Sequence, residues 1–164
     1  MPRVNLKSNN RKVSLTATFL TVLFGIIIFV VPSLLINIIP QSSLGNYFID
    51  YIYYAYSILP IILYIIITGF YYYYIKIDTY IMYVTSSRTI SGLFKSKNYI
   101  EVPHDMLRQY SFFNRSFTLN KTLMLKIQDV NGKKIIRRFN ISFLSKSEER
   151  KISKVFDEII AKNS

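Results

Sequence analysis

The sequence predicts an α+β membrane protein, in which a transmembrane helical hairpin precedes an antiparallel β domain with a C-terminal amphipathic helix. Three observations lead to this fold class. Residues 13–75 contain a single charged side chain, Asp50. From Lys76 to Asn140 apolar and polar residues alternate over several short runs, which is typical of strands with one buried face. From Lys146 onward apolar residues recur at helical spacing.

Two uncharged stretches, 15–39 and 51–75, are each long enough to cross a bilayer. About 20 apolar residues suffice, because a helix rises about 1.5 Å per residue and the hydrocarbon core is about 30 Å thick. Residues 40–46 between them are rich in turn-forming types. The predicted organisation is therefore a basic N-terminal segment, a transmembrane hairpin and a β domain, at residues 1–12, 13–75 and 76–164.

Tyrosines gather at both ends of the second predicted span. Amphipathic aromatic rings prefer the headgroup level of a bilayer. Tyr54 and Tyr72 are separated by about 27 Å of helix, close to one hydrocarbon thickness. A ligand-binding aromatic cluster is an alternative, although adjacent tyrosines on a helix point around its whole circumference. The predicted interface belts consist of Tyr51, Tyr53, Tyr54, Tyr71, Tyr72, Tyr73 and Tyr74.

Basic residues flank the predicted hairpin on one side only. Arg3, Lys7, Arg11 and Lys12 precede it without any acid, Lys76 follows it, and the connecting loop has no base. Positively charged flanks are retained in the cytoplasm. We therefore expect a multi-pass protein with both termini cytoplasmic, and the lipid bilayer as its first partner.

The clearest signal in the β domain is the Asn131-Gly132 pair. It lies between residues 123–129 and 133–139, two runs of strand character. Both residues tolerate the positive φ that a tight hairpin turn requires. We therefore predict an antiparallel hairpin centred on this pair.

The C-terminal segment is predicted to be a helix that packs on the sheet. Ser145 and Glu148 have the spacing of a capping box. A helix lying on the membrane surface is the alternative, but the polar face here mixes acids with bases. The face that we expect to be buried consists of Ile152, Val155, Phe156, Ile159 and Ile160.

Residues 80–90 and 100–106, the Asn131-Gly132 hairpin and the helix over 146–161 resemble a known family. Its members are small bacterial membrane proteins with an N-terminal helical hairpin and a C-terminal bacterial pleckstrin-homology-like domain. The resemblance implies an antiparallel β-barrel capped by the C-terminal helix, and a location in the bacterial inner membrane. It brings no catalytic signature, so it bears on fold more than on function.

Composition and motifs argue against several functional classes. The chain has no cysteine and one histidine, His104, so thiolate metal sites and disulfides are excluded. No nucleotide-binding loop, zinc-protease helix or nucleophile elbow occurs. The net charge of +12 is not accompanied by a nucleic-acid-binding motif. We therefore expect no enzyme activity, no catalytic, metal or cofactor-binding residues, no cofactor and no nucleic-acid partner.

Protein interaction is the function that we expect. The chain would be a membrane-anchored scaffold or accessory subunit that docks another membrane protein, or a second copy, through its β domain. An anionic-lipid headgroup module is one alternative, and a component of a small transporter is another. Bidentate capture of a carboxylate or phosphate would favour arginines over lysines. The candidate interaction patch, unless it is simply a solvated strand face, consists of Lys133, Lys134, Arg137, Arg138, Lys95 and Lys97.

Overall fold

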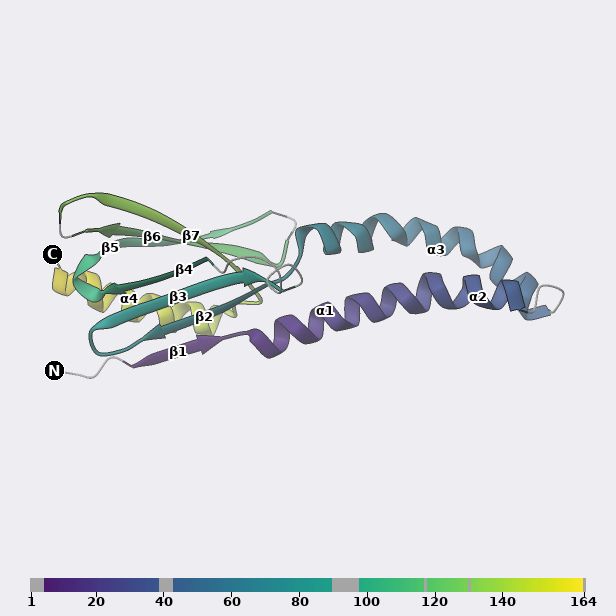
Figure 1. Cartoon of the computed structure of the whole chain (residues 1–164), viewed down its shortest axis with the longest axis horizontal. Helices are drawn as coiled ribbons and strands as arrows, with labels where there is room; N and C mark the ends of the chain where they lie inside the picture. The colour runs from purple at the N-terminus through teal and green to yellow at the C-terminus, as the bar shows by residue number, and fades with distance from the viewer. Residues whose placement is uncertain (1–4, 39–42, 90–97, 117, 130, 164) are drawn as a thin grey trace. The chain divides into compact units, whose positions relative to one another are not determined.

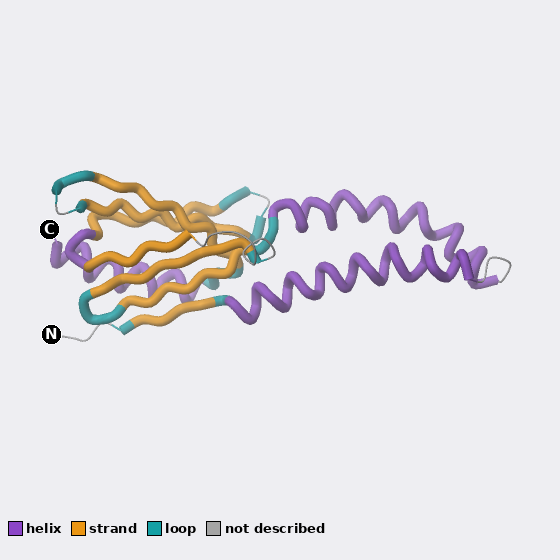
Figure 2. Tube along the Cα trace, viewed as in Figure 1, coloured by secondary structure: helices purple, strands orange, loops and turns teal. Residues whose placement is uncertain are grey.

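The computed structural model describes residues 5–38, 43–89, 98–116, 118–129 and 131–163 (Figure 1). The chain divides into a helical unit, Thr16–Gly69, and a β unit made of Met1–Leu15 and Phe70–Ser164. The predicted α+β class is confirmed, since helices and antiparallel sheets are both present (Figure 2).

The first predicted span is a continuous helical stretch from Arg11 to Ile38, long and apolar enough to cross a membrane. It consists of α1 (Arg11–Gly25), a π-helical turn η1 (Ile26–Val30) and α2 (Val31–Ile38). Pro32 explains the wide turn, because proline has no N–H and its ring crowds the carbonyl one turn earlier. The backbone N–H of Val31 instead donates to the carbonyl of Ile26, five residues before it.

The second predicted span ends earlier than expected. Helix α3 covers Ser43–Thr68, and the chain then forms strand β2, Tyr71–Ile77, so the expected end near residue 75 is wrong. Gly69 has a φ of 65° and donates its N–H to the carbonyl of Ile65 at 2.9 Å, which is how glycine commonly ends a helix. Aromatic and β-branched residues then favour the strand. Within the helical unit, the rings of Phe29 and Tyr56 lie 6.1 Å apart, so α3 packs against the first helical stretch.

The β unit contains two antiparallel sheets. The first has the order β1-β2-β3-β4, and the second has the order β5-β6-β7. Over the described strands the sheets do not close into the barrel that was expected, because β1 forms an edge. Strand β7 lies against the first sheet: the Ser86 hydroxyl in β3 donates to the carbonyl of Asn140, and the Asn98 side chain in β4 donates to the carbonyl of Arg138 at 2.8 Å. The remaining strands are β1 (Leu6–Asn9), β3 (Ile81–Arg88), β4 (Asn98–Pro103), β5 (Leu107–Asn114), β6 (Asn120–Gln128) and β7 (Lys134–Ser142), with a 3-10 turn η3 (His104–Met106) before β5.

Strand β1 was not predicted. It is antiparallel to β2, with Leu6 opposite Ile77 and Asn9 opposite Tyr74. The basic N-terminal segment therefore contributes an edge strand to the β unit. Its four residues are too few to show a period, and its partner is more than 60 residues away in the sequence.

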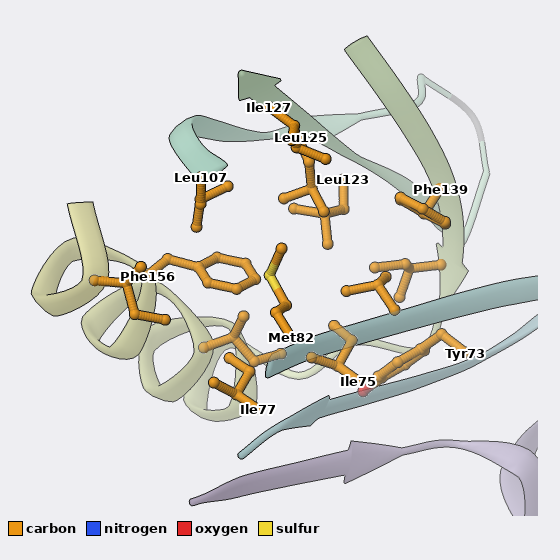
Figure 3. Close-up of a cluster of buried hydrophobic side chains, with 14 of the residues drawn as sticks. Tyr73, Ile75, Ile77, Met82, Leu107, Leu123, Leu125, Ile127, Phe139 and Phe156 are labelled. Carbon is orange, nitrogen blue, oxygen red and sulfur yellow. The ribbon is translucent and has the colours of Figure 1, made fainter. Parts of the chain in front are cut away.

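The core of the β unit lies between the two sheets and helix α4 (Lys146–Asn163) (Figure 3). Phe156 points from α4 toward Met82 and the side chains of the second sheet. Alternate residues are buried at 73–77 of β2 and at 123–127 of β6, as period-two geometry requires. The fully enclosed side chains include Tyr73, Ile75, Ile77, Met82, Leu107, Leu123, Leu125, Phe139, Ile141, Ile152 and Phe156.

Two local predictions for the β unit are confirmed. The hairpin itself is formed, and Gly132 has a φ of 76° in the turn between β6 and β7, where its N–H donates to the carbonyl of Asp129 at 2.8 Å. Asn131 does not have the positive φ that was expected, because the loop is closed more widely, by the N–H of Asp129 donating to the carbonyl of Lys133 at 2.9 Å. The hydroxyl of Ser145 accepts the backbone N–H of Glu148 at 3.1 Å, which caps α4. All five apolar residues of the predicted helix face belong to the core or pack against it.

Candidate functional site

The predicted interaction patch divides between two faces of β7. Arg138 lies opposite Met124, and Arg137 lies opposite Leu125, whose side chain is in the core. Successive side chains of a strand point to opposite faces. Arg137 and Arg138 therefore do not act on one ligand as neighbours. Of the other predicted patch residues, Lys133 is exposed in the turn, Lys134 is exposed at the start of β7, and Lys95 and Lys97 lie outside the described residues.

Arg138 instead shares a groove with Arg115, on the outer face of the second sheet. The groove has a volume of about 430 Å³ and is lined by Phe113, Arg115, Thr122, Met124, Arg138 and Asn140. The strand register explains this grouping, because Phe113 lies opposite Thr122, and Thr122 lies opposite Asn140. The Thr122 hydroxyl donates to the side-chain carbonyl of Asn140 at 3.2 Å.

The apolar part of this groove is exposed to solvent. Phe113 is 51% exposed, and Met124 is half-buried. Ile136 lies on the same face of β7 as Arg138, two residues away, and is also exposed. The groove thus places guanidinium groups beside apolar side chains.

The two groove arginines differ from Arg108 and Lys121 in their surroundings. Arg108 donates to the Gln128 side chain at 2.9 Å and to the Asn163 carbonyl at 2.6 Å, and Lys121 is paired with Glu149. No ion pair involving Arg115 or Arg138 occurs among the residues that the structure describes. A guanidinium group can bind a carboxylate or phosphate through two parallel hydrogen bonds.

Arg115 was missed in the sequence because it follows β5 in a turn. Its backbone N–H donates to the carbonyl of Asn120 at 3.1 Å, which brings the residue back toward the start of β6. Only the pairing of β5 with β6 places it near Arg138. Nothing local in the sequence indicates that pairing.

The tyrosines of the predicted belts differ in secondary structure and in burial. Tyr54 is 71% exposed on α3, whereas the side chains of Tyr51 and Tyr53 lie outside those described. Tyr71, Tyr72, Tyr73 and Tyr74 are in strand β2, not on a helix as expected, because α3 has already ended at Thr68. The role of Tyr54, Tyr71, Tyr72 and Tyr74 at a membrane interface stays a prediction.

Tyr73 is fully buried, so it cannot contact a membrane interface in this fold. Its hydroxyl lies 3.1 Å from the Ser8 hydroxyl and donates to a carboxylate oxygen of Glu148 at 3.2 Å. Burial, followed by the negative charge of Glu148, raises the pKa of Tyr73 to about 12, despite the opposing hydrogen bond from Ser8. This cluster joins β1, β2 and α4.

The single histidine, His104, lies in the turn before β5. Burial is the main cause that lowers its pKa, so the imidazole is neutral at pH 7. Its backbone is fixed at both ends, since the N–H donates to the Tyr80 carbonyl at 3.0 Å and the carbonyl accepts from Asn163 at 2.6 Å. In the described part of the chain, no group of three His, Asp or Glu side chains could hold a metal ion.

Comparisons with protein-family models, with curated proteins and with solved structures found no match to this chain.

Proposed function

We propose that this chain is a membrane-anchored, non-enzymatic docking protein, with a hairpin of two spans as its anchor. The β unit, of pleckstrin-homology-like type, binds an acidic segment of a partner membrane protein. The observation that carries the proposal is the groove in which Arg115 and Arg138, without ion-pair partners among the described residues, flank Phe113 and Met124. Arginine beside exposed aromatic and apolar side chains is the composition typical of interface hot spots.

The pairing of β1 with β2 supports a hairpin anchor. The chain leaves the β unit after Leu15 and returns to it at Phe70, and the strands on the two sides of this excursion, β1 and β2, are adjacent. A segment that leaves and returns on one side of a bilayer crosses it an even number of times. The stretch Arg11–Ile38 is long and apolar enough to be one crossing. We infer that the helix Ser43–Thr68 is the second, and the basic flanks favour the cytoplasm for both termini.

Asn10, between β1 and α1, is hydrogen-bonded to strands β2 and β7. Its side-chain amide donates to the carbonyls of Tyr71 at 3.1 Å and Ser142 at 2.6 Å, and its side-chain carbonyl accepts the N–H of Tyr73 at 2.7 Å. The residue is 5% exposed. A buried amide with all these partners fixes the start of α1 to β2 and β7.

Polar side chains of the helical unit give little support to a transporter. They bond to carbonyls of their own helix, as Ser33 does to Phe29 at 2.6 Å and Thr68 does to Tyr64 at 2.9 Å. Hydroxyls satisfied in this way do not need a partner ion or substrate. The same pattern holds for Thr21, Asn37 and Ser57.

Anionic-lipid binding is the second candidate, because Lys133 and Lys134 expose two ammonium groups near the hairpin turn. Each base near an anionic surface contributes about 1 kcal/mol, and this attraction does not depend on a shaped groove. If attraction to anionic lipid alone caused binding, neutralising Lys133 and Lys134 would weaken it as much as neutralising Arg115 and Arg138. Docking in the arginine groove predicts unequal effects.

Photo-crosslinking in native membranes separates the two functions. A photoreactive residue replaces Met124, and the full chain carries either the pair R115Q/R138Q or the matched pair K133Q/K134Q. We expect one discrete protein adduct that falls at least 10-fold in R115Q/R138Q, since two charge-assisted hydrogen-bonding groups contribute about 1.5–3 kcal/mol each. The K133Q/K134Q chain should retain it. Adducts to lipid alone, or equal losses in both pairs, would reject docking in the groove.

A further inference from the structure

A second groove lies on the outer face of the first sheet, at the turn between β2 and β3. It has a volume of about 570 Å³ and is lined by Tyr74, Lys76, Asp78, Thr79, Tyr80, Ile81, Tyr83 and Glu101. This size falls in the range of small-molecule sites, about 300–1,000 Å³.

Two tyrosine rings form the wall of this groove. The rings of Tyr74 and Tyr83 lie 5.9 Å apart in an edge-to-face arrangement, on neighbouring strands β2 and β3. Tyr80, in the turn, is 73% exposed. Aromatic faces carry partial negative charge and attract cations.

The charges of the lining also favour a cation. The Lys76 ammonium is paired with the Asp78 carboxylate at 3.0 Å, and this hydrogen bond raises the pKa of Lys76 and lowers that of Asp78. Glu101 lies directly opposite Tyr83 on β4 and has no ion pair among the described residues. The lining residues of the groove thus carry one carboxylate more than their single ammonium group neutralises, in a protein of net charge +12.

One cation already lies over this wall. The ammonium of Lys7, on β1, is 5.9 Å from the centroid of the Tyr74 ring, within the distance typical of a cation–π interaction. Lys7 lies beside Lys76 in the strand register. The face of Tyr74 therefore accommodates an ammonium group in this fold.

We propose that the groove binds a soluble alkylated ammonium ion, of the choline type, against Tyr74 and Tyr83, with the Glu101 carboxylate as its counter-charge. Methylated ammonium groups suit aromatic walls because they need no hydrogen-bond acceptor and lose little hydration.

Titration of tetramethylammonium chloride into the full chain in maltoside micelles tests the site, with sodium chloride of equal ionic strength as the reference. Calorimetry should give saturable binding that weakens at least 10-fold in Tyr83→Leu. Tyr99→Leu is the matched control, because Tyr99 is 61% exposed on the same sheet and does not line the groove. It should bind within twofold of the unmodified chain.

Glu101→Gln provides a second readout that leaves the aromatic wall intact, and it should weaken binding at least threefold. The proposal is overturned if the unmodified chain shows no saturable binding, if Tyr83→Leu and Tyr99→Leu behave alike, or if Glu101→Gln binds unchanged. If the chain binds phosphatidylcholine vesicles but not tetramethylammonium, the ligand is a lipid headgroup, and the proposal of a soluble ammonium ligand is overturned.

Discussion

Replacing Tyr73 with phenylalanine removes one hydroxyl from the cluster that joins β1, β2 and α4. The hydroxyl donates to Glu148 at 3.2 Å and lies 3.1 Å from the Ser8 oxygen, in a side chain with no solvent exposure. A hydrogen bond to a charged group contributes about 1.5–3 kcal/mol, and Glu148 would keep only the weaker contact from Ser8 at 3.4 Å. We expect Tyr73→Phe to lower the free energy of unfolding of the β unit by about 2 kcal/mol at pH 8.

The pH dependence gives the same prediction a second test. The pKa of Tyr73 is raised from 10.0 to about 12 in the folded state, so the folded protein holds this proton more tightly than the unfolded chain does. The resulting stabilisation is fully present below pH 10 and is lost as the pH rises toward 12. Allowing for solvent screening, the free energy of unfolding lost between pH 10 and pH 12 is roughly 2 kcal/mol. The difference in free energy of unfolding between the unmodified protein and Tyr73→Phe should therefore decrease from pH 10 to pH 12.

Urea denaturation of the full chain in maltoside micelles, followed by far-ultraviolet circular dichroism, measures both effects. A loss of about 2 kcal/mol moves the midpoint by about 1 M at typical urea dependences. Tyr72→Phe is the matched control, because Tyr72 is the neighbouring tyrosine of β2 and is only partly buried. Equal midpoints for the two variants at pH 8 would refute the buried cluster and restore an interfacial role for Tyr73.

The same denaturation assay checks three further predictions. Phe156→Ala should cost about 3–5 kcal/mol, because the ring is fully enclosed in the core. Phe113→Ala should cost less than about 0.5 kcal/mol, because that ring is exposed. Comparable losses in the two variants would contradict the assigned core. Gly132→Ala should cost about 1 kcal/mol, because alanine is strained at a φ of 76°. No clash adds to this cost, since the nearest atom to a new Cβ is 3.9 Å away. An unchanged midpoint would argue against this turn. Ser145→Ala should cost about 1 kcal/mol by removing the cap of α4, and Ser145→Asp should restore most of it.

Signals within a few residues of one another made parts of the fold predictable. The turn between β6 and β7 depends on the positive φ of Gly132, and α4 depends on a cap and a repeated apolar spacing. Neither depends on a distant partner. The first apolar helix was predictable for the same reason, because length and lack of charge are local properties.

Features that depend on long-range pairing were not predictable. The four tyrosines of β2 are as compatible with a helix end as with a strand, and pairing with β1 and β3 decides between them. The arginine groove has the same origin. Arg115 and Arg138 come together only because β5 and β7 lie on either side of β6, whereas the adjacent Arg137 and Arg138 are separated by the alternation of a single strand.

Single-cysteine labelling tests the central claim, a two-span anchor that holds the β unit on one side of a membrane. The chain has no native cysteine, so the variants Asn5→Cys, Asn46→Cys and Lys162→Cys each report one position without background. In sealed membrane vesicles, a membrane-impermeant maleimide should label positions 5 and 162 from the same side and position 46 only from the opposite side. Labelling of positions 5 and 162 from opposite sides, or of all three from one side, would contradict the anchor.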